Sequence, residues 1–522
     1  MIFFYCGNFI LLVPLLSMLL RNILAVNLPR RGIKVGLGII WLLMILALFR
    51  FREIVITIPW GSNWLQIPDF FFGVDQVAVN FVTALLTGLL VLLLWNPMPR
   101  SQVEHLLILS GIGMLGIMAA NVVTLLLVWT LLDVLWLSRK ILHSGWQLEK
   151  DNEYFPVIML GVGPLFLLLA AGMVSWEGSG LMLSELPSKA VPFLTAAGFL
   201  RLGVFYPMGS TLAGEADPVR WFRRIVPTVV GLVILTRIVE LDGFSPGAVF
   251  IRPVLAVLTL MLGILWVLGE DQSENRWLWT VGIGLVVLGN VLQAGVGDAP
   301  PAAVEAISTW GLGFLLTGSI PFLIRKRTSL SWPLLFGTGL GLVSLPFTPL
   351  WSGTSLYHRG DLWGLLGLVG AGLLIGGTWK SLRIRSGDGK RSQAHPLAFL
   401  PGLLGVGLLV LTQYGLALSQ GLIDHSLSAG IQDWPRLLPG IIAGGVFFSG
   451  PALDRLPGVW HKLPTFIRRY LGWIELGLEK VLGFSGLIVN LTGSLLEGRG
   501  GLVWSLLTAF FLLSWIITGG FQ

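Results

Sequence analysis

Two ionisable residues, Asp133 and Arg201, each lie within a long run of apolar residues. Burying a charge away from water is costly, so such residues usually pair with one another or mark a path for ions or protons. Asp133 stands within about two helical turns of Arg139 and Lys140, so either pairing with them or a role in charge transport fits it. Arg201 has no such neighbours. We expect it to be a buried, internally paired charge that shapes an internal polar path.

Prolines that interrupt apolar segments are a second feature that indicates a transport function. Pro207 ends the segment that holds Arg201, and Pro346 and Pro349 stand close together in Ser344-Leu345-Pro346-Phe347-Thr348-Pro349. A membrane helix that breaks at proline exposes backbone groups to an internal cavity, as in transporters built from two repeated halves. The two interruptions fall in the two halves of the chain, which favours paired functional breaks over ordinary kinks.

Other kinds of chemistry find little support in the sequence. One cysteine, Cys6, excludes disulfides, thiolate metal sites and iron–sulfur clusters held by this chain alone. The six histidines are scattered without a pair at metal-ligand spacing, and no phosphate-binding glycine motif follows a strand. We therefore predict no catalytic residue, metal or cofactor, and any redox chemistry must belong to another chain.

The composition indicates which elements hold these residues. The chain has 522 residues, of which 54% are hydrophobic and 12% charged, whereas roughly 25% charged residues are usual in soluble proteins. At about 20 apolar residues per crossing, the length suffices for roughly 15 or 16 membrane helices and leaves no room for a sizeable soluble domain. The 67 Gly and 28 Pro are tolerated in such bundles because neighbouring helices satisfy the freed backbone groups.

Hydropathy predicts an all-α, polytopic membrane bundle of sixteen transmembrane helices, with spans 7 and 12 broken. The predicted spans lie near residues 2–20, 34–49, 77–95, 104–120, 122–138, 155–175, 190–207, 225–239, 251–269, 277–295, 303–324, 332–350, 362–380, 396–419, 437–453 and 502–519.

The distribution of basic residues predicts the orientation. If the connection that holds Arg21, Arg30 and Arg31 is cytoplasmic, alternate connections on that side hold 26 of the 34 Lys and Arg residues. This asymmetry is the usual determinant of membrane orientation, and it explains the net charge of +7 without a nucleic-acid partner. We expect a multi-pass protein of the cytoplasmic (inner) membrane of a prokaryote, with both termini on the non-cytoplasmic side.

Two stretches depart from the pattern of spans and short loops. Residues 52–75 contain the alternating run Ile54-Val55-Ile56-Thr57-Ile58 and several turn residues, which predicts a small exposed hairpin or loop. Residues 456–500 mix aromatic, apolar and charged side chains, as a helix in the membrane interface or against a partner would; a solvated connector is the alternative. The predicted organisation is a bundle over 1–453, an interfacial segment over 454–501 and a final span over 502–522.

Several short motifs occur in an order that points to a known family. They are Phe72-Gly73-Val74-Asp75-Gln76-Val77-Ala78, Glu153-Tyr154-Phe155, the segment from Gly198 to Pro207, the segment from Pro218 to Gly231, and Ser344-Leu345-Pro346-Phe347-Thr348-Pro349-Leu350-Trp351-Ser352-Gly353. Their succession resembles the antiporter-like, proton-translocating membrane subunits of respiratory complex I, Mrp antiporters and membrane hydrogenases. The resemblance covers most of the chain, although each motif alone is weak.

The chain departs from this family at the residues that relay protons. In the family these are a glutamate in span 5, a lysine in span 7, a histidine or lysine in span 8, a histidine and a lysine in span 11, and a basic residue at the end of span 13. The matching positions here are Thr130, Arg201, Arg223 or Arg224, Ala306 with Trp310, and Lys380. A relay group must release and regain a proton, which arginine does not do because guanidinium pKa values lie above about 12.

Two interpretations of these departures remain. In the first, ions still move along water chains, with Arg201 as a fixed charge, Asp133 in place of the missing glutamate and Lys380 as a titrating group. In the second, the pathway is disabled and the chain completes a larger assembly as a structural subunit.

The resemblance favours a non-redox subunit of a complex I-type, NADH:quinone oxidoreductase-like assembly that couples electron transfer to translocation of protons or monovalent cations. Its expected partners are other membrane subunits and the lipid bilayer. A membrane subunit of a cation/proton antiporter or of an inorganic-carbon uptake system is the alternative from a different functional class.

Overall fold

The computed structural model describes most of the chain up to Leu453. The described residues are 12–19, 30–48, 53–58, 69–95, 98–144, 154–177, 182–204, 217–239, 241, 248–268, 276–294, 300–323, 331–357, 361–384, 400–420 and 431–453. The chain divides after Leu453 into two units, and every described residue belongs to the first. The predicted break at Pro207, the interfacial segment 454–501 and the last span 502–522 therefore lie outside the described residues.

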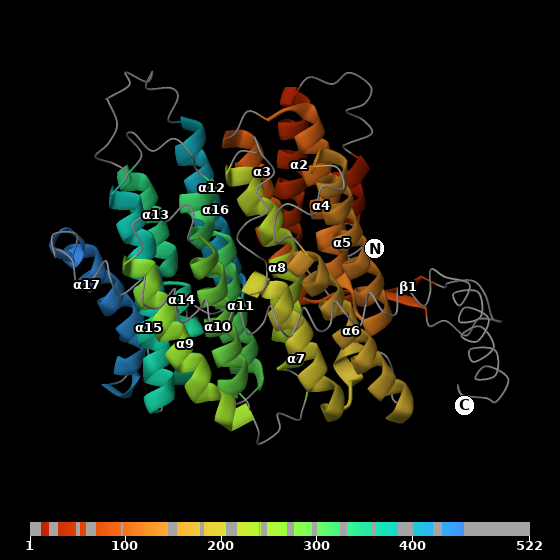
Figure 1. Cartoon of the computed structure of the whole chain (residues 1–522). Coiled ribbons are helices and arrows are strands. Elements are labelled where there is room, and N and C mark those ends of the chain that lie inside the picture. Colours follow the sequence, from red (N-terminus) through yellow and green to blue (C-terminus); the bar gives the residue numbers. More distant parts are fainter. Residues whose placement is uncertain are drawn as a thin grey trace. The chain divides into compact units, whose positions relative to one another are not determined.

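Helices make up almost all of the described residues and most of them run along a common direction (Figure 1). In the first half they are α2 (Arg30–Leu48), α3 (Gln76–Trp95), α4 (Arg100–Met118), α5 (Val122–Ser144), α6 (Tyr154–Glu177), the 3-10 turns η1 (Leu183–Glu185) and η2 (Ser188–Ala190), α7 (Val191–Phe199), the π-helical turn η3 (Leu200–Val204) and α8 (Asp217–Ile238).

The second half follows the same pattern, with shorter helices around its middle. Its elements are α9 (Ala248–Leu268), α10 (Arg276–Ala294), α11 (Pro300–Leu315), η4 (Thr317–Ser319), α12 (Ile320–Leu323), α13 (Ser331–Leu342), α14 (Leu350–Gly353), η5 (Ser355–Tyr357), α15 (Leu362–Ile384), α16 (Leu400–Ser419), η8 (Ile431–Leu437) and α17 (Leu438–Leu453).

Two strands form the expected hairpin between the second and third predicted spans. β1 (Ile54–Ile58) pairs antiparallel with β2 (Phe70–Val74), with Ile56 opposite Phe72. The alternating β-branched run favours a strand because successive side chains point to opposite faces. The predicted hairpin is thus confirmed, and it adds a small sheet to a fold that was expected to be all-α.

Helices α3, α8 and α11 occupy the centre of the bundle. α3 and α11 contact each other and both contact α8, and the apolar windows of α3 and α11 are almost entirely buried. A helix that is apolar on all faces has no side suited to water, so it is stable only inside a core or a membrane. By contrast α2 exposes a stripe of apolar residues, Val35, Ile39, Leu42 and Leu46, at helical spacing.

The helices also agree with a membrane location. Five helical stretches in the described part of the chain are long and apolar enough to cross a bilayer: Gln76–Leu94, Arg100–Met118, Ile251–Leu268, Ala302–Leu323 and Leu362–Lys380. Five shorter apolar helices accompany them. A membrane helix bundle is therefore supported, while the count of sixteen spans and the function of the broken spans remain predictions.

Candidate functional site

The backbone around Arg201 departs from a regular helix. α7 begins with Pro192 in its first turn, where proline costs little because the first N–H groups have no helical partner. From Leu200 the chain continues as the π-helical turn η3. A π turn holds extra backbone and changes the direction of the side chains that follow, and such turns are frequent at functional sites. Arg201 is the second residue of this turn.

Two glycines let α8 approach this turn closely. A Cβ on Gly231 would lie 2.7 Å from the carbonyl oxygen of Gly198 and 2.9 Å from the Cβ of Arg201. Both distances are too short for real atoms, so a side chain at position 231 would push α8 away from α7 and η3. The backbone of Arg201 is therefore held against α8 by a contact that only glycine permits.

The side chain of Arg201 forms an ion pair with Asp133 of α5. The Nη1 group of Arg201 donates to the Oδ1 atom of Asp133. Arg201 is 3% exposed and the side chain of Asp133 is 14% exposed. A buried charge without a partner costs several kcal/mol. Separating η3 from α5 would leave both charges unpaired, so the ion pair holds these two elements together.

The same guanidinium group also stacks on an aromatic ring. The Cζ atom of Arg201 lies 4.4 Å from the ring centre of Trp129, which is fully buried. Trp129 and Asp133 are four residues apart on α5, so they lie on the same face of the helix. Gly163 of α6 makes room for the indole, since a Cβ there would lie 2.7 Å from the Trp129 ring.

Several polar atoms of this pair have no hydrogen-bond partner among the described residues. The Asp133 Oδ2 atom and the Arg201 Nε and Nη2 atoms are buried and make no hydrogen bond to any described residue. Buried polar groups are usually satisfied, and those that are not often have a functional role or bind water. The site thus offers one hydrogen-bond acceptor and two donors to a water molecule.

Arg223 and Arg224 lie on α8, at a different level from the pair. They stand seven to eight residues before Gly231, which corresponds to about 10–12 Å along the helix. Arg223 is buried and Arg224 is half-buried. The structure therefore puts these two arginines on the helix that supports Arg201, about two turns before Gly231.

Lys380 lies near the end of α15, against α9. It is buried, and its Nζ atom donates to the carbonyl oxygen of Val267 at 3.2 Å. α10 contacts both η3 and α15, so it separates Lys380 from Arg201 within the bundle. The two predicted path residues thus belong to different parts of the helix packing.

Pro346 and Pro349 stand in an irregular segment between α13, which ends at Leu342, and α14, which begins at Leu350. Phe347 has a φ of 69°, which is uncommon for residues other than glycine. The Thr348 hydroxyl accepts from the backbone N–H of Leu345 at 3.1 Å and contacts the carbonyl oxygen of Val343 at 2.6 Å. Side chains therefore satisfy backbone groups that a regular helix would have paired.

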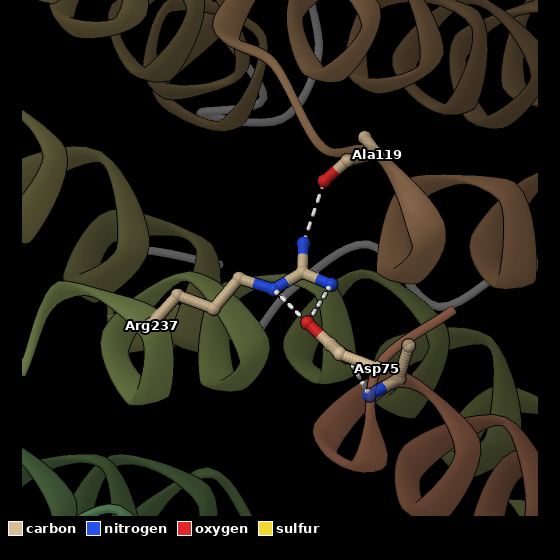
Figure 2. A network of polar contacts seen from close by, with 4 residues as sticks. Asp75, Ala119 and Arg237 are labelled. Atoms are coloured by element: carbon tan, nitrogen blue, oxygen red, sulfur yellow. Dashed lines mark hydrogen bonds and ion pairs between the residues drawn. The ribbon is translucent and has the colours of Figure 1, made fainter. Parts of the chain in front are cut away.

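Sequence reasoning missed an ion pair that joins α3 and α8 (Figure 2). The carboxylate of Asp75 accepts from the Arg237 Nη2 and Nε atoms at 2.9 and 3.2 Å, and from the backbone N–H of Ala78 at 2.6 Å. Arg237 also donates to the carbonyl oxygen of Ala119 at 2.6 Å. The sequence did hold a signal for Asp75, because an aspartate directly before an apolar run is a typical helix cap.

The positions that match the span 11 relay residues are apolar or aromatic in this bundle. Ala306 and Trp310 are fully buried, and the Trp310 indole N–H donates to the carbonyl oxygen of Gly353 at 2.7 Å. Nearby, Thr317 donates to the Gln413 side chain at 2.7 Å. These contacts are made by groups that do not titrate.

No protein-family model and no curated protein matches this sequence. Solved structures do match over most of the chain. A chain of the Mrp complex from Dietzia sp. DQ12-45-1b has a TM-score of 0.59 at 17% identity, covering 99% of this chain and 63% of its own length. The present chain thus spans less than two thirds of that relative.

Two respiratory complexes contain further similar chains. One belongs to the membrane-bound sulfane sulfur reductase, an archaeal respiratory membrane complex, with a TM-score of 0.62, 14% identity and coverage of 97% of this chain and 99% of the other. The other belongs to respiratory complex I from Thermus thermophilus, with a TM-score of 0.59, 15% identity and coverage of 84% and 99%. The chain therefore has the antiporter-like fold that the motifs implied, in a divergent form.

Proposed function

We propose that this chain is an antiporter-like membrane subunit of a complex I-type, NADH:quinone oxidoreductase-like assembly, which couples electron transfer to translocation of protons or monovalent cations. The observation that carries the proposal is the buried Asp133–Arg201 pair, held between α5 and the π-helical turn η3 in a fold shared with chains of respiratory complexes. In this proposal the redox chemistry belongs to other chains, and the partners of this chain are other membrane subunits.

In this proposal Arg201 acts as a fixed positive charge. It stabilises the ionised form of Asp133 and does not itself release a proton, because guanidinium groups remain protonated. The buried Asp133 Oδ2 atom and two Arg201 nitrogens, which make no hydrogen bond within the described part of the chain, support a short chain of waters along which a proton or small cation moves. Asp133 then takes the place of the glutamate that Thr130 replaces.

The other proposed path residues extend this route across the bundle. Lys380 supplies a titratable group in the second half, while Arg223 and Arg224 set a positive potential near the beginning of α8. The irregular segment with Pro346 and Pro349 gives backbone carbonyl groups access to the interior, and Pro207 is proposed to do the same after η3. The proposed location is the cytoplasmic membrane of a prokaryote, with both termini on the non-cytoplasmic side.

A second candidate function is a membrane subunit of a cation/proton antiporter or inorganic-carbon uptake system. The likeness to a chain of an Mrp complex, which covers 99% of this chain, favours it. A non-pumping structural subunit is the third. It is favoured by the replacement of the relay lysine with Arg201, because this change keeps the charge and hydrogen bonds but removes the ability to release a proton.

Co-purification under mild detergent tests the proposal. The full chain, tagged at one terminus, is solubilised from its native membrane, and the recovered partners are identified by mass spectrometry. Recovery with quinone-linked, iron–sulfur-bearing subunits supports the redox assembly. Recovery alone, together with robust ion exchange in vesicles, would exclude it and support solitary antiport. The matched control is the same tag on an unrelated multi-pass protein, which removes non-specific partners.

A further inference from the structure

Arg436 stands directly before the predicted span 437–453, yet the packing of α17 against α15 places it at membrane depth (Figure 1). A Cβ on Gly372 of α15 would lie 3.0 Å from the Cα atom of Pro439, so these two residues lie side by side. Gly372 is near the middle of Leu362–Lys380, one of the stretches that are long and apolar enough to cross a bilayer. Pro439 therefore lies about midway along that stretch.

The step from Pro439 back to Arg436 is short. Arg436 belongs to η8, a 3-10 helix, and such a helix rises about 2 Å per residue, so the three residues between them account for at most about 6 Å. Half of the hydrocarbon core of a bilayer measures about 15 Å. Arg436 thus lies within the apolar layer, where an ionisable residue is costly and usually marks an ion path.

Trp351, the second residue of α14, holds the guanidinium group. The Nη2 atom of Arg436 donates to the carbonyl oxygen of Trp351 at 2.7 Å, and its Cζ atom lies 4.0 Å from the centre of the Trp351 ring. Trp351 is 3% exposed. One buried tryptophan therefore offers the cation both a carbonyl oxygen and an electron-rich face, which together fix the position and the orientation of the guanidinium plane.

The backbone of Arg436 is bound to the other side of the irregular segment between α13 and α14. The hydroxyl of Ser344, which follows α13, donates to the carbonyl oxygen of Arg436 at 2.7 Å. The same hydroxyl lies 3.2 Å from that of Thr354. Arg436 thus bridges the break, with its backbone on the α13 side and its side chain on the α14 side.

Carbonyl groups at the end of α13 are also occupied by side chains. Pro346 has no N–H to return to the last turn of α13, and the last carbonyl groups of a helix need other donors. The Gln413 amide donates to the carbonyl oxygen of Gly341 at 2.9 Å, and the Tyr414 hydroxyl donates to that of Leu340 at 3.2 Å. Side chains of α16 and η8 therefore fill positions at which carbonyl groups of a broken helix could coordinate a cation.

We propose that Arg436 is a tethered cation that keeps the break between α13 and α14 closed to small monovalent cations such as Na⁺. Its guanidinium group occupies the Trp351 carbonyl oxygen that a passing ion would bind. Guanidinium groups stay protonated, so deprotonation does not lift the block. The carbonyl group becomes available only when the guanidinium group moves aside. The proposal rests on the proposed transport function, and it assigns Arg436 the prevention of passive leakage and not the transfer of a proton.

Passive uptake of Na⁺ tests this role. The full chain is reconstituted in K⁺-loaded vesicles, valinomycin sets an inside-negative potential, and uptake of radiolabelled Na⁺ is followed without an electron donor. Arg436→Met keeps a side chain of flexible shape against Trp351 but cannot donate a hydrogen bond. We expect its initial rate of Na⁺ uptake to exceed that of the wild type at least about tenfold, the factor that corresponds to loss of one hydrogen bond from a charged group.

A conservative variant separates the cation from its packing. The ammonium group of Arg436→Lys can donate to the same carbonyl oxygen, so its uptake rate should stay within about twofold of the wild type. Arg100→Gln, which removes an exposed arginine of α4, is the control for loss of a positive charge elsewhere. Arg436→Gln, which is shorter and uncharged, replaces Arg436→Met if that variant does not accumulate.

Two results would overturn the proposal. A wild-type uptake rate in stably folded Arg436→Met would show that Arg436 closes nothing, and equally raised rates in Arg436→Met and Arg436→Lys would show that packing, and not the cation, closes the break. Because no electron donor is supplied, the uptake rates can be read whichever partners co-purify. Rejection of the redox assembly is thus distinguishable from rejection of the tethered cation.

Discussion

Arg201 pairs with Asp133, which lies 68 residues earlier in the chain, while its guanidinium carbon stands 4.4 Å from the ring centre of Trp129. Each partner compensates part of the cost of burying the charge: the carboxylate by its opposite charge, and the indole through its electron-rich face. Because both partners belong to one face of α5, rotation or sliding of α5 against η3 would break both contacts together. The cluster therefore fixes the register of these two elements.

Two substitutions of Arg201 distinguish the effect of its positive charge from the effect of losing the side chain. Arg201→Ala leaves the Asp133 carboxylate buried without a partner, and we expect a loss of about 3–5 kcal/mol in the free energy of unfolding. Arg201→Lys keeps the charge and should retain assembly; a lysine can also release a proton, so proton coupling should increase. Thermal unfolding in detergent and yield of the assembled complex measure these effects. Wild-type assembly and coupling in the alanine variant would show that Arg201 has no such role.

The indole ring should contribute separately from the carboxylate. Trp129→Phe keeps an aromatic face beneath the guanidinium, whereas Trp129→Leu removes it. We expect the leucine variant to be less stable than the phenylalanine variant by about 0.5–2 kcal/mol, the range for a cation–π contact. Comparing the two in the Arg201→Ala background supplies the control. If the two Trp129 variants differ by the same free energy in the Arg201→Ala background, packing alone accounts for the difference, and the cation does not contribute.

The close approach of α8 gives a steric prediction. Gly231→Ala would place a methyl group 2.7 Å from the Gly198 carbonyl oxygen and 2.9 Å from the Arg201 Cβ. We expect a loss of about 1–3 kcal/mol from forced displacement of packed backbone. Gly38→Ala on α2 meets no atom within 4 Å and should instead gain up to about 1 kcal/mol from helix propensity. Equal effects in thermal unfolding would contradict the close contact.

The Asp75–Arg237 pair should stabilise the junction between α3 and α8 (Figure 2). Arg237→Gln removes the charge that faces Asp75 and weakens the bond to the Ala119 carbonyl. Because Arg237 is largely buried, we expect a loss of about 1–3 kcal/mol. Arg100→Gln, which breaks an exposed pair with Glu104, should cost at most about 0.5 kcal/mol. Similar losses in both variants would contradict the special role of the buried pair.

Composition and periodicity predicted the helical bundle and the hairpin, because apolar runs and the alternating Ile54–Ile58 segment are local properties of the chain. They also singled out Arg201 and Asp133, since a charge inside an apolar run is visible without any structure. The sixteen-span count stays a prediction. So do the roles of residues 454–522, which lie beyond the part of the chain that the structure describes.

The partner of Asp133 could not be predicted from the sequence. Arg139 and Lys140 are close along the chain, whereas Arg201 reaches the carboxylate only because a π-helical turn redirects it and glycines at positions 198 and 231 allow α8 to approach. These features depend on how helices rotate and pack, and a single residue's shift in register would undo them.

The number of protons moved per electron in vesicles tests the role of Asp133 and Arg201 most directly. The assembled complex, purified with either the wild-type chain or Asp133→Asn, is reconstituted and supplied with its electron donor. We predict that Asp133→Asn lowers the proton-to-electron ratio while the rate of electron transfer is retained, because asparagine cannot carry the proton or charge that Asp133 holds beside Arg201. An unchanged ratio in a stably assembled Asp133→Asn complex would contradict this role and leave the pair purely structural.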